Sequence, residues 1–165
     1  MSLRCARIYV SKKDAERGSI WTIKVCEEFT VSLSEPAEII DDIEFLDDWE
    51  ARYQYIIDLG KALPKLPEEA RVDELKVKGC QSDVWLLPKR QGDVLTFQVD
   101  SDAVIVRGLL ALVMAAYNEK TPTEILAFDI DGFFQALDLE RHISPTRGNG
   151  LRAIVGRIRE LASAA

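Results

Sequence analysis

The chain has 165 residues, of which 47% are hydrophobic and 30% charged, a balance typical of a globular domain that buries a core. Its formal net charge is -7, and an acidic surface repels phosphate backbones and anionic lipids, so neither nucleic acid nor a membrane is expected as a partner. The most apolar stretch, residues 103–117, contains Arg107 and is shorter than the roughly 20 residues that span a bilayer. No apolar signal segment follows Met1, and we expect a cytoplasmic protein.

The first 34 residues form an N-terminal extension of unknown role, and residues 35–165 form the main domain. Within the extension, the segment from Ile20 to Val25 alternates between apolar and polar residues, as a strand does. The extension is either a short hairpin packed on the domain or a loose segment.

Two helices are predicted at the start of the main domain. Ser34 is a candidate N-cap for a helix that reaches about Phe45. Asp47 or Asp48 then caps a second helix, whose apolar residues recur with a period of 3.6. Gly60 and Pro64 are expected to end this second helix, and residues 63–67 are expected to be extended.

The middle third of the chain changes to a strand pattern. Residues 95–99 alternate strictly, and residues 84–87 form a short apolar run that Pro88 is expected to end. Residues 89–92 contain a glycine and are predicted to form the hairpin loop, and a third strand is predicted at residues 74–77.

Helices follow again after the strands. Residues 100–102 offer an N-cap for an apolar helix at about 103–118, and Thr121 with Glu124 forms a capping box. A short helix begins at Asp131, and a last helix follows Ser144 and Pro145. This order of elements predicts an α+β fold, with a small antiparallel three-stranded sheet covered on one face by helices.

The cysteines give no metal pattern. Cys5, Cys26 and Cys80 are widely spaced, and only His142 could join them as a nitrogen ligand. A structural zinc site needs four ligands, usually in two close pairs, so neither a metal nor another cofactor is expected. A disulfide framework is equally unexpected in a chain with this much core.

Cys80 has the most informative surroundings of the three. A single cysteine is commonly a small buried hydrophobe without reactivity. Here Gly79 precedes the cysteine and two polar turn residues follow it, which places the thiol on a loop between predicted strands. Lys76 and Lys78 supply nearby positive charge that could lower the pKa of the thiol, and what sets this pKa stays open at this point. Residue chemistry alone leaves both an inert and a reactive cysteine open.

Four blocks of the sequence resemble one family. Residues 79–85, Gly-Cys-Gln-Ser-Asp-Val-Trp, resemble the G-C-Q-S-x-V-W motif of SufE-type proteins, which accept sulfur from cysteine desulfurases in iron–sulfur cluster assembly. Residues 49–60, residues 100–109, and residues 121–122 with 142–151 resemble further family blocks in the same order. Together these blocks cover about residues 40–165.

The resemblance implies a SufE/IscU-like fold and a sulfur relay. A desulfurase forms a persulfide on its own cysteine, and the thiolate of Cys80 attacks the outer sulfur and becomes a persulfide itself. The implied partners are a SufS-like or CsdA-like desulfurase and a downstream scaffold complex that receives the sulfur. Such a carrier and desulfurase activator uses no metal and has no independent turnover.

The matching blocks also supply six candidate supporting residues: Gly79, Gln81, Ser82, Asp102, His142 and Arg147. Asp102 is expected to cap the helix that follows or to place a negative charge in its first turn, with a partner contact as the alternative. His142 is expected to be a packed or surface residue, with proton transfer to Cys80 as the alternative. Arg147 is either a solvated charge at a helix start or a group that steers a sulfur anion or docks the partner. Gln81 and Ser82 are expected to shape the loop through bonds from their side chains to the backbone, and Trp85 is expected to anchor the sheet in the core.

Two other classes of function stay open. A metal or iron–sulfur scaffold of similar fold would hold its metal with three cysteines, but the middle and last thirds of this chain contain only Cys80. A stand-alone thiol enzyme, such as a peroxidase or hydrolase, would need an activating base and a substrate pocket. Cys26 could also serve as a second, resolving thiol.

Overall fold

The computed structural model describes residues 9–12, 21–24 and 33–165, and the chain divides into two units, residues 1–30 and 31–165. In the first unit, β1 (Tyr9–Lys12) pairs antiparallel with β2 (Trp21–Lys24), with Tyr9 opposite Lys24. The strand predicted at Ile20–Val25 is therefore present as β2. Cys5 and Cys26 lie outside the described residues.

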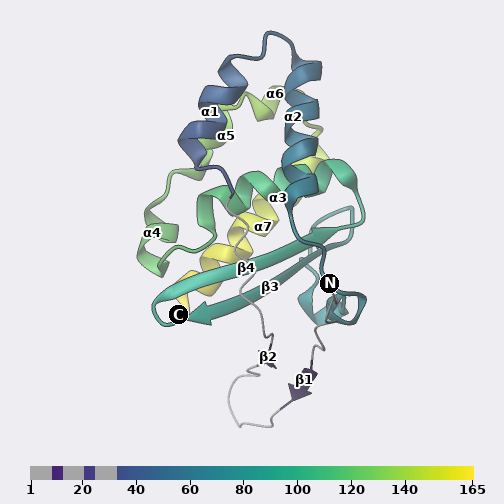
Figure 1. Cartoon of the computed structure of the whole chain (residues 1–165), viewed down its shortest axis with the longest axis vertical. Coiled ribbons are helices and arrows are strands. Elements are labelled where there is room, and N and C mark those ends of the chain that lie inside the picture. The colour runs from purple at the N-terminus through teal and green to yellow at the C-terminus, as the bar shows by residue number, and fades with distance from the viewer. Residues whose placement is uncertain (1–8, 13–20, 25–32) are drawn as a thin grey trace, which may run out of the picture. The chain divides into compact units, whose positions relative to one another are not determined.

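The second unit combines seven helices and two short 3₁₀ turns with one antiparallel pair of strands (Figure 1). In chain order these are α1 (Pro36–Glu44), α2 (Trp49–Ala62), η1 (Glu68–Ala70), η2 (Asp73–Leu75), β3 (Val84–Gln91), β4 (Val94–Ser101), α3 (Val104–Tyr117), α4 (Pro122–Ala127), α5 (Ile130–Ala136), α6 (Leu139–His142) and α7 (Pro145–Ser163). The α+β class is confirmed. No helix in the described ranges is long and apolar enough to cross a membrane.

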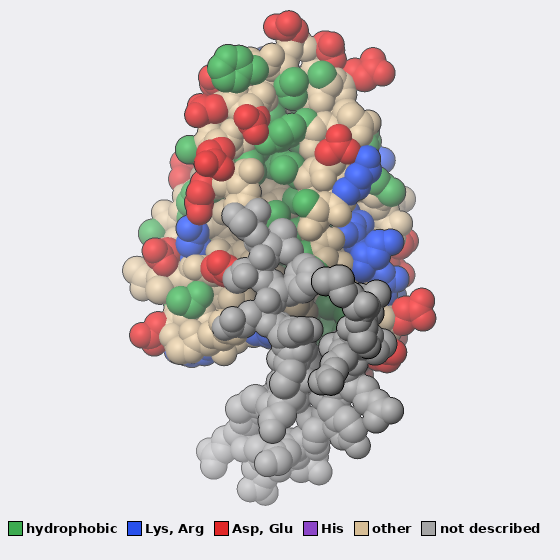
Figure 2. All heavy atoms as spheres, viewed as in Figure 1, with side chains coloured by type: hydrophobic (Ala, Val, Ile, Leu, Met, Phe, Trp, Pro, Cys, Tyr) green, Lys and Arg blue, Asp and Glu red, His purple; other side chains and the backbone are tan. Residues whose placement is uncertain are grey.

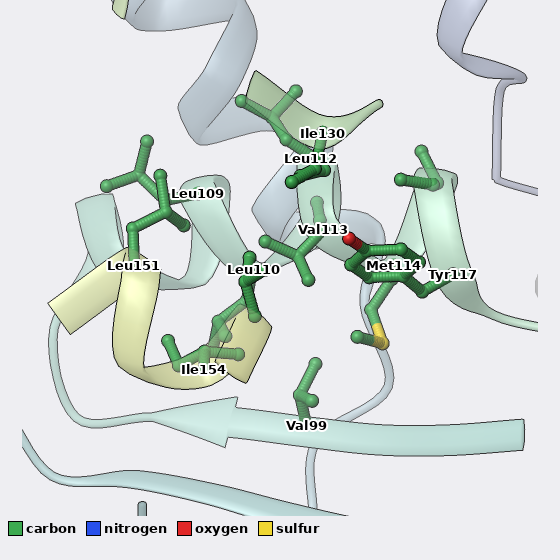
Figure 3. Close-up of a cluster of buried hydrophobic side chains, with 14 of the residues drawn as sticks. Val99, Leu109, Leu110, Leu112, Val113, Met114, Tyr117, Ile130, Leu151 and Ile154 are labelled. Atoms are coloured by element: carbon green, nitrogen blue, oxygen red, sulfur yellow. The ribbon is translucent and has the colours of Figure 1, made fainter. Parts of the chain in front are cut away.

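The core forms around α3, which crosses the middle of the unit between the sheet and the group α1, α2, α5 and α6 (Figure 1). Nearly every residue of α3 from Gly108 to Tyr117 is buried, as its apolar sequence predicts. Leu110 of α3, Ile154 of α7 and Val99 of β4 belong to this one cluster (Figure 3). α3 therefore packs both with β4, which directly precedes it in the chain, and with α7 at the end of the chain.

The predicted third strand is absent from the described part of the chain. The sheet of the second unit contains only β3 and β4, in register from Val84 opposite Ser101 to Gln91 opposite Val94. In place of the third strand, η2 winds through Asp73–Leu75, and Lys76 makes one isolated bridge to Trp85. The segment is too short to extend this bridge, because Gly79 turns the chain away three residues later.

The hairpin also differs from its prediction. β3 runs through Pro88 to Gln91 instead of ending at Pro88, and the turn lies at Gly92 and Asp93. A proline removes one backbone donor but is compatible with a strand that has a free edge. Gly92 adopts a φ of +61°, which suits glycine in a tight turn.

Gly60 does not end α2 as predicted but lies inside the helix, against Gly108 of α3. A Cβ on Gly60 would come within 2.5 Å of the Gly108 nitrogen, and one on Gly108 within 2.5 Å of the Ile56 oxygen. The two glycines therefore let the helix backbones touch. The predicted role of Pro64 is confirmed: α2 ends at Ala62, because Pro64 holds the preceding residue Leu63 in an extended conformation.

The helices α2, α4 and α7 start at predicted capping residues, whereas α1 and α3 do not, and α5 follows the N-cap Asp129 instead of beginning at Asp131. Asp48 accepts from the Ala51 N–H at 2.7 Å, and Thr121 with Glu124 forms the expected capping box. Ser34 does not cap α1. The N-cap of α1 is Glu35, whose N–H donates to the Glu38 carboxylate at 3.2 Å.

Candidate functional site

The Cys80 loop, residues 78–83, is held at both ends by backbone contacts. On the first side, the Val77 N–H donates to the Val84 oxygen at 2.9 Å. On the second side, the Asp83 N–H donates to the Asp102 carboxylate at 3.0 Å, and the Asp102 N–H donates to the Asp83 oxygen at 3.3 Å. These bonds fix where the loop leaves and rejoins the sheet.

Gly79 gives the loop its turn. Its φ is +93°, a conformation that residues with a side chain rarely adopt, and a Cβ there would lie 3.4 Å from the Cβ of Ala153 in α7. The loop therefore packs closely on α7, and the turn at Gly79 places Cys80 against this helix. The prediction that Gly79 shapes the loop has a structural basis in this φ value.

The thiol of Cys80 lies half-buried over the first turns of α7. Its Sγ–H donates to the backbone oxygen of Gly150 at 3.5 Å, a distance suited to a weak sulfur donor. A Cβ on Gly150 would be in ordinary contact with Sγ, also at 3.5 Å. α7, which begins 65 positions after Cys80, thus forms the floor of the site.

Burial raises the pKa of the Cys80 thiol, because a partly desolvated site disfavours the thiolate. Lys76 and Lys78 therefore do not lower this pKa. Lys76 instead pairs with Asp83 at 3.1 Å and Asp73 at 3.4 Å, and Lys78 is exposed. Burial at this site therefore favours the protonated thiol over the thiolate.

A cavity of about 110 Å³ adjoins Cys80. Its apolar wall comes from Val106 and Leu109 of α3 and from Leu151 and Ile154 of α7. Its polar lining comes from Gln81, Ser82, Thr146 and Arg147. A water molecule needs only roughly 10–15 Å³ of such space, so the cavity can hold additional atoms bonded to the sulfur.

Three predicted residues, Gln81, Ser82 and Arg147, therefore share this cavity with Cys80. Arg147 is exposed, and its backbone N–H donates to Oγ of Ser144, the N-cap of α7, at 3.5 Å. Its side chain brings a permanent positive charge to the space beside the sulfur.

His142 does not line this cavity. Its ring stacks on Trp49 of α2, with the ring centroids 3.8 Å apart and the planes 15° from parallel. Its Nε2 lies 3.4 Å from a carboxylate oxygen of Asp138. These contacts agree with the packed or surface residue that the sequence predicts, and they tie α6 to the start of α2.

Asp102 does not cap α3. The N-cap of that helix is Ala103, and the Asp102 carboxylate instead holds the Cys80 loop through the Asp83 N–H. The predicted first-turn role is therefore replaced by a direct structural link to the loop. Because Asp102 is exposed, its side chain is also accessible to a partner.

Sequence reasoning missed Asp100, which is fully buried at the end of β4. Its carboxylate pairs with Arg107 of α3 and with Arg71 at 2.7 Å, and it accepts from the Leu66 N–H at 3.0 Å. Arg107 also donates to the oxygens of Gly60 and Leu63 at the end of α2. The sequence did contain a signal for this cluster. Arg107 is the single charged residue in an otherwise apolar helix, and a charge that is buried with such a helix requires a partner of opposite charge.

Trp85 is buried beside this cluster and supports β3, as predicted. Its ring lies 5.5 Å from the Arg71 guanidinium carbon and 5.7 Å from the Lys76 nitrogen. Among the described residues, no group of three or more histidine, cysteine or acidic side chains is placed to hold a metal ion.

Comparison with known proteins places this site in a family. The family model described as "SufE: Fe-S metabolism associated domain" matches residues 37–162, which include the Cys80 loop and the α7 floor. The chain belongs to the SufE family. Its relatives include an uncharacterised SufE-like protein of Rhizobium etli, 53% identical over 129 residues that cover 76% of this chain and 87% of the relative. Another from Rhizobium meliloti is 48% identical over 76% of this chain and 92% of its own length.

The SufE fold is also seen in a solved structure. The solution structure of a hypothetical protein from Thermus thermophilus matches with a TM-score of 0.65 and 20% identity, over 79% of this chain and 94% of that one. At this identity the match shows a shared fold. Membership of the SufE family associates the chain with iron–sulfur metabolism.

Proposed function

We propose that the protein is the sulfur acceptor and activator of a cysteine desulfurase, with Cys80 as the acceptor. The observation that carries the proposal is a half-buried thiol at the GCQS loop beside a cavity of about 110 Å³. The cavity offers room for one more sulfur atom next to Sγ. Residues 35–165 would form the acceptor domain, and residues 1–34 an extension of unknown role.

The transfer step is a thiol exchange without net oxidation. The Cys80 thiolate attacks the outer sulfur of the desulfurase persulfide, the S–S bond of that persulfide breaks, and the desulfurase cysteine leaves as a thiolate. Cys80 then carries the S–SH group. A second exchange passes the outer sulfur to a thiol of the downstream scaffold complex.

The raised pKa of Cys80 fits a carrier that stays idle until it meets its donor. Inside its cavity the thiol is protonated and therefore a poor nucleophile. Drawing Cys80 away from Gly150 and into the active site of a SufS-like or CsdA-like desulfurase would remove this effect of burial. Arg147 lines the same cavity, so a movement of its side chain toward Cys80 would bring a positive charge to a sulfur anion there.

Desulfurase turnover tests the proposal. Adding the wild-type protein to a desulfurase with free cysteine should raise the rate of alanine release, because an acceptor regenerates the free thiol of the enzyme. Cys80→Ser should give no such increase. Equal stimulation by the two proteins would reject Cys80 as the acceptor.

A further inference from the structure

Phe45 is an exposed aromatic residue that the fold does not need. It follows the last residue of α1, and its relative exposure is 85%, higher than that of the other exposed large hydrophobic residues Val104, Val72 and Leu126. An exposed aromatic ring of this kind is a common anchor of protein interfaces.

The residues around Phe45 concentrate the negative charge of the protein. Between residues 35 and 50 the chain carries eight acidic side chains and no lysine or arginine, whereas the rest of the chain carries 20 acidic and 21 basic side chains. All eight are exposed: Glu35, Glu38, Asp41, Asp42, Glu44, Asp47, Asp48 and Glu50. Figure 2 shows acidic side chains gathered with apolar ones over the end formed by α1 and the start of α2. We call Phe45 and these eight residues the Phe45 pole.

Several of these charges work against the helices that carry them. Glu44 lies at the C-terminal end of α1, where the helix dipole disfavours negative charge, and Asp41 lies three residues before it on the same face. Among the described residues, the pole has one ion pair, from Glu35 to Lys120 at 3.6 Å. Capping at helix starts accounts for Glu35, Glu38 and Asp48. Asp42 accepts a hydrogen bond from the Tyr55 hydroxyl at 2.7 Å, whereas Asp41 and Glu44 are exposed charges without such a contact among the described residues.

α2 connects the pole to the elements around Cys80. This helix is about 20 Å long at 1.5 Å per residue, and it runs from the pole to the contact between Gly60 and Gly108. Val106, two residues before Gly108, lines the Cys80 cavity. A standard interface of roughly 800 Å² per partner is about 30 Å across, which exceeds the length of α2.

We infer that the Phe45 pole is a second docking surface for the desulfurase, which would meet it with lysine and arginine side chains around an apolar recess that takes the Phe45 ring. The inference rests on the proposed function. Opposite charge provides the complementarity, and the ring provides the anchor. We assign the pole to the donor because the donor must reach the thiol while it is half-buried over α7, and contacts remote from the sulfur can hold the two proteins together while the loop moves.

The test is persulfide loading of Cys80 as a function of acceptor concentration, with a SufS-like desulfurase. Phe45→Ala should raise the KM for the acceptor about tenfold with little change in kcat. Glu44→Lys should raise it about threefold at low salt, and less at high salt. The matched controls are Leu126→Ala, another exposed hydrophobic residue, and Asp93→Lys in the β3–β4 turn. Both controls should behave as wild type.

A measurement of binding without sulfur transfer tests the docking surface separately from the reaction of Cys80. Titrating the desulfurase with Cys80→Ser, with and without Phe45→Ala, should show weaker binding when Phe45 is absent, although neither protein can accept sulfur. Equal binding, or equal KM values for the pole variants and their controls, would overturn the docking surface while Cys80 loading stands. A defect confined to onward transfer would also overturn it, because the pole would then serve the recipient. Failure of wild-type protein to gain sulfur would reject the proposed function and this inference with it.

Discussion

The thiol of Cys80 donates to the backbone oxygen of Gly150 across 3.5 Å, although the two residues are 70 positions apart in the chain. This contact places the cysteine of the GCQS loop on the first turns of α7 and beside the cavity that α7 shares with α3. The same burial that shelters the sulfur suppresses its ionisation. We therefore expect the loop to have two positions. In the position described here the sulfur of Cys80 is sheltered over α7, and in a second position Cys80 is exposed and can react.

Alkylation of the free protein should reveal the suppressed ionisation. In a Cys5→Ser/Cys26→Ser background, the rate of reaction of Cys80 with iodoacetamide should rise with pH to a midpoint above the ordinary value of about 8.5, because burial raises this pKa. Binding of the desulfurase should change the alkylation rate at a fixed pH. A midpoint below the ordinary value in the free protein would contradict the sheltered thiol, and denatured protein provides the unperturbed reference.

Gly79→Ala should lower the free energy of unfolding by about 1–2 kcal/mol, because φ at this position is +93° and alanine is strained there. The strain should also displace Cys80 from Gly150 and change its alkylation rate. Gly156→Ala is the matched control, since this glycine lies exposed within α7 with nothing within 4 Å of an added Cβ. The control should stabilise the protein by up to about 1 kcal/mol. Urea denaturation measures both, and equal effects would argue against strain at Gly79.

Arg107→Met should destabilise the protein by about 2–4 kcal/mol, because it leaves the fully buried Asp100 without one of its two arginine partners. Arg152→Met removes an exposed partner of Glu140 and should cost less than about 1 kcal/mol. Both replace an arginine by the same residue, so their difference in urea denaturation reports the effect of burial. Similar values for the two variants would show that the Asp100 cluster contributes little.

His142→Phe distinguishes a packing role from proton transfer. Phenylalanine can keep the stack on Trp49, so persulfide loading of Cys80 should stay within about twofold of wild type, whereas loss of a general base costs roughly 100-fold or more. His142→Ala should alter the fluorescence of Trp49, because the indole loses its neighbour. If His142→Phe lost loading at the larger scale, with its fold intact by circular dichroism, proton transfer would be the better account.

Local patterns predicted the features that depend on near neighbours in the chain. The capping box at Thr121, the apolar helix α3 and the strand pair all follow from spacing within a few residues. Features set by distant contacts were missed or misread. Gly60 looked like a helix end because its partner Gly108 lies 48 positions away, and Asp100 looked like a cap because Arg71 and Leu66 are 29 and 34 positions away.

In the candidate site too, the sequence predicted the features that depend on near neighbours and missed those that depend on distant contacts. The motif around Cys80 identified the loop, but the α7 floor and the cavity arise only when residues 146–154 fold back onto it. The sign of the pKa shift stayed open for this reason, since nearby lysines are visible in the sequence and burial is not.

Intact mass spectrometry of the protein after incubation with a cysteine desulfurase and free cysteine tests the central claim most directly. Wild-type protein should gain about 32 Da, the mass of one sulfur held as a persulfide, and lose it again with a reducing thiol. Cys80→Ser should keep its original mass under the same conditions. A gain of the same size on Cys80→Ser would place the sulfur on Cys5 or Cys26 and contradict the account.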